Sequence, residues 1–148
     1  MNTFITNAED SEEVRDVIRI LLTSTGEPYT LEQLKDGYEF MERLTKKEPM
    51  DIAILDIHMP GFSIIEAVKQ LTRDWKQTYI IVVSADDDLD VILELQNKYH
   101  IWGYILKSHD FSSELTRLVY EAHVKVQDKN EYIERVLKEA IKLGDAKQ

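Results

Sequence analysis

The sequence contains no cysteine, which excludes disulfide bonds and any thiolate that could bind a metal or act as a nucleophile. Basic residues are also few, since 18 Lys and Arg stand against 28 Asp and Glu and leave a formal net charge of −10. This charge repels phosphate backbones and anionic lipids, so we expect no direct nucleic-acid binding by this segment. The five glycines are scattered, and no glycine-rich turn follows the first apolar run, which argues against a dinucleotide-binding enzyme.

Long hydrophobic runs are absent as well. No apolar stretch approaches the length of a membrane span, and the first residues lack the basic and apolar regions of a signal peptide. We therefore expect a cytoplasmic protein without a membrane partner. A length of 148 residues with 43% hydrophobic content suits one globular domain with a single sizeable core.

The most informative stretch is an unbroken apolar run at residues 52–55, which ends on Asp56 and is followed by Pro60 and Gly61. Four consecutive apolar residues are typical of a strand that is buried on both faces of a parallel sheet. Ligands bind such sheets at the carboxyl ends of the strands, where Asp56 would lie. An aspartate before a turn is often only a turn former, so a functional role for Asp56 depends on other residues that converge on it.

Strand and helix patterns alternate along the rest of the chain. Short apolar or alternating runs predict strands at residues 3–8, 28–34, 52–55, 79–83 and 102–106, and apolar residues at helical spacing predict a helix after each strand. Asp10, with Glu13 three residues later, resembles a capping box for the first helix. Five such units with short connections predict a doubly wound, five-stranded parallel sheet of the flavodoxin-like type, with helices on both faces.

The polar residues 127–130 separate a predicted domain at residues 1–126 from a C-terminal helical extension or linker at residues 127–148. Residues at alternating spacings of four and three form a heptad seam: Leu115, Val119, Ala122, Val126, Lys129, Ile133, Val136 and Ala140. One helix over about residues 112–143 would be roughly 48 Å long. This pattern favours a homodimer, paired in parallel through the fifth helix and its extension. The alternative is a bend at residues 127–130 that folds the last segment back onto the domain.

Polar side chains follow four of the predicted strands: Glu9 and Asp10, then Asp56, then Ser84, and finally Lys107. Parallel strands bring these residues to one edge of the sheet. Three carboxylates there would raise one another's pKa unless a cation joined them, and Mg²⁺ prefers a few carboxylates together with water and a phosphate. Lys107 and Ser84 supply a charge and a hydroxyl that can hold phosphoryl oxygens. The set predicts phosphoryl transfer onto Asp56.

In this order, the motifs resemble the receiver domain of two-component response regulators over about residues 3–126. The matching motifs are Glu9-Asp10, Leu55-Asp56 followed by Met59-Pro60, Ser84-Ala85 and Gly103-Tyr104-Ile105-Leu106-Lys107. The resemblance implies that Asp56 accepts a phosphoryl group from a histidine kinase or phosphotransfer protein. It also implies a magnesium site formed by Glu9 or Asp10, Asp56 and the backbone carbonyl of His58.

The resemblance further implies that Ser84 and Lys107 bind the phosphoryl oxygens. Tyr104 stands at the switch-aromatic position and would turn inward as Ser84 moves toward the phosphoryl group. Such a domain is a phosphorylated signalling switch and not an enzyme, although it assists its own phosphoryl transfer and dephosphorylation. The His58 imidazole is an alternative metal ligand, but we expect it to point to solvent beside the site.

Two residues depart from the family pattern. Ser108 replaces the proline that usually follows the lysine, and Ile64 stands where glycine is common. These changes leave the path after Lys107 and the start of the third helix open, but they remove no chemical group from the site. The alternative functions are a pseudo-receiver that binds partners without phosphorylation and a phosphatase with an aspartyl nucleophile. The phosphatase would need an acid at position 58, which is histidine.

Overall fold

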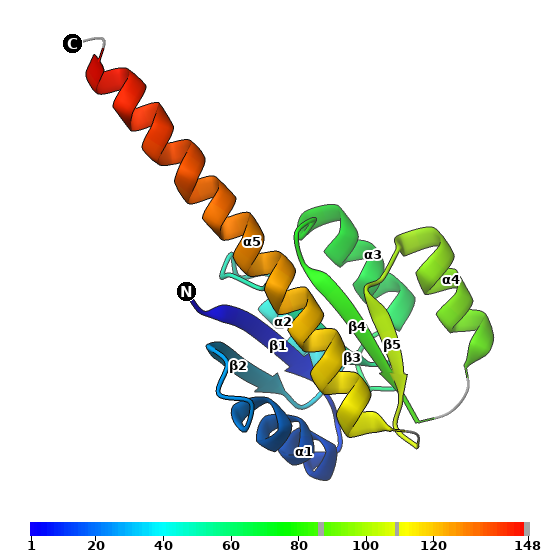
Figure 1. Cartoon of the computed structure of the whole chain (residues 1–148). Helices are drawn as coiled ribbons and strands as arrows, with labels where there is room; N and C mark the ends of the chain where they lie inside the picture. Colours follow the sequence, from blue (N-terminus) through cyan, green and yellow to red (C-terminus); the bar gives the residue numbers. More distant parts are fainter. Residues whose placement is uncertain (86–87, 109, 147–148) are drawn as a thin grey trace.

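The computed structural model describes residues 1–85, 88–108 and 110–146. Five parallel strands form one sheet in the order β2-β1-β3-β4-β5. The strands are β1 (Thr3–Ala8), β2 (Tyr29–Leu34), β3 (Ile52–Asp56), β4 (Tyr79–Ser84) and β5 (Gly103–Leu106). The helices are α1 (Glu12–Thr23), α2 (Gly37–Arg43), α3 (Ile64–Asp74), α4 (Leu89–Tyr99) and α5 (Phe111–Ala146) (Figure 1). The predicted doubly wound fold is confirmed.

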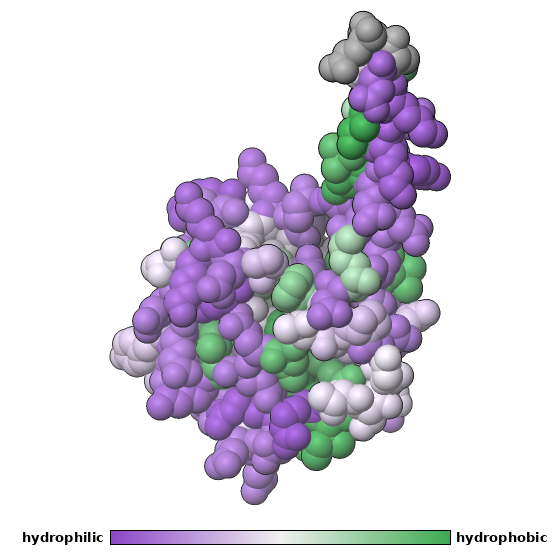
Figure 2. All heavy atoms as spheres, turned by 90° about the vertical axis from the view of Figure 1, so that its left-hand side faces the viewer, coloured by the Kyte–Doolittle hydropathy of each residue, from purple (hydrophilic) through white to green (hydrophobic). Residues whose placement is uncertain are grey.

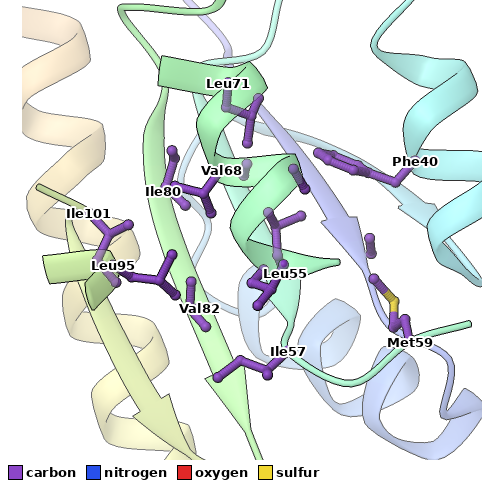
Figure 3. Packing of buried hydrophobic residues seen from close by; sticks show 14 of the residues in the cluster. Phe40, Leu55, Ile57, Met59, Val68, Leu71, Ile80, Val82, Leu95 and Ile101 are labelled. Atoms are coloured by element: carbon purple, nitrogen blue, oxygen red, sulfur yellow. The ribbon is translucent and has the colours of Figure 1, made fainter. Parts of the chain in front are cut away.

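Each face of the sheet has its own apolar layer. On one face, Leu55 and Val82 pack with residues of α2, α3 and α4, among them Phe40 and Leu71 (Figure 3). On the other face, Ile54 and other strand residues pack against α1 and α5. All five residues of β3 are buried, because this strand lies between β1 and β4 and is covered on both sides. The continuous apolar run of β3 is the sequence signature of this position.

The first helix begins one residue later than the capping box predicts. Ser11 is the N-cap of α1, and its hydroxyl accepts a hydrogen bond from the backbone N–H of Val14 at 3.3 Å. The interpretation of Asp10 as the cap is therefore wrong. Serine is as good an N-cap residue as aspartate, so two adjacent candidates could not be separated by pattern alone. The Asp10 carboxylate therefore does not cap α1 and remains available for other contacts.

The two departures from the family pattern are accommodated locally. Helix α3 starts at Ile64 with Ser63 as its N-cap, while the left-handed backbone conformation falls on Gly61, with φ of 93°. A Cβ atom at Gly61 would lie 2.5 Å from the ring of Tyr38, but this ring is exposed and can move aside, so the backbone conformation is the main reason for glycine here. The Lys107–Ser108 peptide bond is trans, as are all the peptide bonds in the described ranges.

Helix α5 runs without a break from Phe111 to Ala146, so the chain does not bend at residues 127–130. Its first half packs on the sheet, and its second half projects away from the domain (Figure 1). Leu115, Val119, Ala122 and Val126 are buried against the domain itself. The first half of the predicted heptad seam is therefore not available to a partner. Within the described residues, no helix is long and apolar enough to cross a membrane.

Candidate functional site

Three carboxylates meet at the carboxyl edge of the sheet. Glu9 and Asp10 follow β1, and Asp56 is the last residue of β3. One ligand oxygen from each residue lies within 4.8 Å of the other two. Glu9 and Asp56 are buried, whereas Asp10 is exposed. The strand order predicts this convergence, because β1 and β3 are direct neighbours in the sheet.

Lys107 brings a positive charge to these carboxylates from the end of β5. Its Nζ atom lies 3.0 Å from Oε1 of Glu9 and 3.4 Å from Oδ2 of Asp56. The backbone N–H of Lys107 donates to the carbonyl oxygen of Ser84 at 2.8 Å, which fixes the residue beside the end of β4. Burial lowers the pKa of Lys107, but the contacts with Glu9 and Asp56 outweigh burial and raise it. The ammonium group is therefore charged in the folded protein.

Glu9 has the most perturbed carboxyl group of the site. Burial is the main reason that its pKa rises from 4.5 to about 7, and the negative charge of Asp56 raises it further, while Lys107 and the backbone of Ser11 oppose the rise. Glu9 is 1% exposed, so its carboxylate has almost no water to stabilise its charge. One lysine does not compensate the two buried carboxylates that it contacts.

The residues present fit a hard divalent cation. Oε1 of Glu9 is buried and accepts no hydrogen bond from any described residue, although it lies close to the Lys107 ammonium. The donor set consists of carboxylate oxygens, and the exposed Asp10 leaves one side of the cluster open to water. Mg²⁺ prefers such a combination of oxygen ligands and retained water. Glu9, Asp10 and Asp56 are the side chains that would hold it.

Ser84, at the end of β4, is buried and lies beside this cluster in the sheet. Among its contacts, its hydroxyl donates to Oδ2 of Asp88 at 3.5 Å. The same oxygen lies 2.5 Å from Nε2 of His58, whose side chain is 60% exposed. The backbone N–H of His58 donates to Oδ1 of Asp56 at 3.3 Å. The imidazole thus lies at the rim, as predicted, and pairs with an acid and not with the carboxylate cluster.

Tyr104 is part of β5, is 40% exposed and does not belong to the carboxylate cluster. Its neighbour Gly103 is buried, and a Cβ atom there would lie 2.9 Å from Cδ1 of Leu118. Glycine therefore allows α5 to approach β5 closely. The exposed side chain of Tyr104 lines a shallow hollow between α4 and α5, together with Gln96 and Arg117.

The sequence did not predict the hydrogen bonds that hold the end of β1 next to the carboxylates. Asn7 donates from Nδ2 to the carbonyl oxygen of Ile54 at 3.1 Å, and its Oδ1 accepts from Gln33 at 3.0 Å. Arg15 donates to the carbonyl oxygen of Glu9 at 2.7 Å. The contacts of Asn7 tie β1 to β2 and β3, and the contact of Arg15 ties α1 to the first residue of the acidic pair. Asn7 could have been noticed, because an amide in a buried strand must be paired.

Comparisons with known proteins agree with this geometry. The family model of the response regulator receiver domain matches residues 5–120. The response regulator GtcR of Aneurinibacillus migulanus is 30% identical over 95 residues, which are 64% of this chain and 38% of GtcR. The DNA-binding transcriptional regulator NtrC of Klebsiella pneumoniae is 32% identical over 82 residues, 55% of this chain and 17% of NtrC. The chain therefore matches less than half the length of these two curated relatives.

Solved structures share the fold over most of the chain. The signal receiver domain of an HD domain-containing protein from Pseudomonas fluorescens Pf-5 superposes with a TM-score of 0.76 at 22% identity, covering 86% of this chain and 99% of that one. The response regulator TrrA from Thermotoga maritima, solved in complex with Mg(2+)-BeF, gives a TM-score of 0.68 at 25% identity. That match covers 81% of this chain and 98% of TrrA.

Proposed function

Because this chain belongs to the family of response regulator receiver domains, we propose that it is a phosphorylation-controlled switch whose acceptor is Asp56. Receiver domains are signalling domains and not classical enzymes. The observation that carries the proposal is the arrangement of three carboxylates and one lysine at the ends of β1, β3 and β5. A histidine kinase or a phosphotransfer protein would be the donor, and the net charge of −10 argues against nucleic acid as a direct partner.

The chemistry follows from the positions of the charges. A carboxylate oxygen of Asp56 attacks the phosphorus of the donor phosphohistidine, and the bond between phosphorus and the imidazole nitrogen breaks. Lys107, whose Nζ atom lies 3.4 Å from Oδ2 of Asp56, would contact the phosphoryl oxygens as they arrive. Glu9, Asp10 and Asp56, together with the backbone carbonyl of His58 that the resemblance implies, would hold Mg²⁺, and the bound cation would supply further neutralisation of the phosphoryl charge. The product is an acyl phosphate on Asp56.

The switch would begin at Ser84. We infer that its hydroxyl exchanges the contact with Asp88 for a phosphoryl oxygen, which displaces the start of α4. Tyr104, now 40% exposed, would turn inward into the space released and alter the surface between α4 and α5. That surface is where a partner would distinguish the two states.

Treatment with acetyl phosphate and Mg²⁺, followed by intact-mass analysis, tests this function. We expect one phosphoryl adduct on the unmodified chain and none on Asp56→Asn, which keeps the shape but removes the nucleophile. Asp90→Asn, an exposed aspartate on α4, is the matched control and should retain the adduct. If the unmodified chain takes up no phosphoryl group from any donor, the pseudo-receiver alternative replaces this proposal.

A further inference from the structure

The projecting half of α5 presents an unpartnered apolar face. Every side chain at residues 131–145 is exposed. Six large apolar side chains in this segment are between 43% and 64% exposed: Tyr132, Ile133, Val136, Leu137, Ile141 and Leu143. An isolated helix of this length is marginal in water, so the segment gains most from a partner that covers this face.

The exposed apolar face lies on the same side of the helix as the face that packs on the sheet. Residues eighteen positions apart are separated by about five full turns and point in the same direction. Ile133 lies eighteen residues after Leu115, and Val136 lies eighteen residues after Leu118; both earlier residues are buried in the domain. Figure 2 shows the hydrophobic atoms of the projecting helix on the edge that overhangs the body of the domain.

This shared direction excludes a parallel pair along the seam. In a parallel pair, the partner helix would continue along the apolar face of α5 toward its first half. That space is filled by the sheet of the same chain, since Leu115, Val119 and Ala122 pack there. Two antiparallel helices that overlap only in their projecting halves avoid this clash, because each domain then lies at the opposite end of the pair.

The distribution of charge also favours the antiparallel arrangement. Residues 128–145 contain five acidic and four basic side chains, so this segment carries −1 and the remainder of the chain carries −9. A nearly neutral, mixed-charge segment can approach a second copy of itself closely. The strongly acidic domains would repel each other if they lay side by side, and the antiparallel arrangement places them far apart.

We propose that two copies of this chain associate as an antiparallel helix pair through residues 130–146 of α5. If residues 130–146 of the two copies overlap fully, the antiparallel pair is centred on residue 138. Ile133 then lies against Leu143 of the partner subunit, and Val136 lies against Ala140 of the partner subunit. Two such faces bury roughly 1,000 Å² in total, about the lower limit of a specific interface, so the dimer is reversible at moderate concentration. This interface lies at the end of the domain away from the carboxylates, and its formation does not depend on phosphorylation.

Sedimentation equilibrium over a wide concentration range tests the association. The full chain should approach twice the monomer mass at high concentration. Ile133→Gln with Val136→Gln should weaken the association at least tenfold, whereas Glu131→Gln with Lys138→Gln, on the opposite face, should leave it unchanged. The same loss for both double variants, or a monomer at all concentrations, overturns the proposal. Thermal melting of each variant verifies that the domain itself remains folded.

Engineered cysteines test the direction of the pair, because this sequence has no cysteine of its own. Ile133→Cys and Leu143→Cys are prepared separately and then mixed in a thiol redox buffer. The antiparallel pair places these two positions together across the interface, so a disulfide should form in the mixture between the two variants. A parallel pair would instead cross-link each variant with itself, which would overturn the proposed orientation.

Discussion

The ammonium nitrogen of Lys107 lies 3.0 Å from a carboxylate oxygen of Glu9, across 98 positions of sequence. This ion pair links the residue after β1, near the start of the sequence, with the residue after β5, at the carboxyl edge of the sheet. It also offsets part of the charge of two buried carboxylates, Glu9 and Asp56. The stability of the domain should therefore depend on which cations the site holds.

Replacement of Lys107 by alanine leaves the carboxylates without their cation. We expect a folded domain whose free energy of unfolding, without Mg²⁺ at neutral pH, is lower by about 1–3 kcal/mol. Urea denaturation measures the change, and Lys98→Ala on α4 is a control at a lysine outside the site. Mg²⁺ should restore part of the loss, because a second cation takes over the charge. Equal stability of the Lys107→Ala variant and the unmodified chain would contradict this role.

The raised pKa of Glu9 predicts a specific pH dependence. The folded chain holds a proton on Glu9 up to a pH of about 7, whereas the unfolded chain releases it near 4.5. Between these values the folded state binds more protons, so the Glu9 contribution to the free energy of unfolding falls as the pH rises, by about 1–3 kcal/mol. Glu9→Gln removes the titration. Without metal, the difference in stability between this variant and the unmodified chain should change across that window; a constant difference would refute the assignment.

Mg²⁺ should compete with the proton for the Glu9 carboxylate. A cation that binds only the folded state adds about 2.7 kcal/mol to the free energy of unfolding at a hundredfold excess over its Kd. Protons compete for Glu9, so the gain in melting temperature with millimolar Mg²⁺ should be larger at pH 8 than at pH 5. Asp10→Asn should reduce the gain at both values. A melting temperature that does not respond to Mg²⁺ would argue against the carboxylate cluster as a metal site.

Gly103 allows the close packing of β5 against α5, so its replacement tests how α5 is held. Gly103→Ala places a methyl group 2.9 Å from the Leu118 side chain, and we expect a loss of about 1–3 kcal/mol in the free energy of unfolding. Gly144 has open space around it in the projecting helix, so Gly144→Ala is the matched control. It should be neutral or slightly stabilising, because alanine favours helix. Equal effects of the two changes would contradict the packing.

Much of the fold follows from the sequence because the central strands are marked by burial. The continuous apolar runs that end at Asp56 and Ser84 mark strands covered on both faces, and the structure confirms both. The convergence of Glu9, Asp56 and Lys107 follows in turn, because parallel strands end at one edge. A continuous apolar run in a short strand requires burial on both faces, and parallel strands necessarily end at the same edge, so both features could be predicted from the sequence.

Other features depend on geometry that a pattern does not contain. Asp10 and Ser11 are both good caps, and only the chain path assigns the role to Ser11. The heptad spacing is present in the sequence, but the domain itself buries the first half of the seam, from Leu115 to Val126, and the periodicity alone does not reveal this. The contact of His58 with Asp88 joins two loops whose approach depends on the packed structure.

The acceptor role of Asp56 can be tested on the phosphorylated residue itself. Borohydride reduces an acyl phosphate of aspartate to homoserine, so treatment of the phosphorylated chain followed by peptide mapping identifies the modified residue directly. We expect homoserine at position 56, in a peptide obtained only after incubation with both phosphodonor and Mg²⁺. Homoserine at Asp10 or at any other aspartate, with Asp56 unchanged, would contradict the assignment of Asp56 as the acceptor.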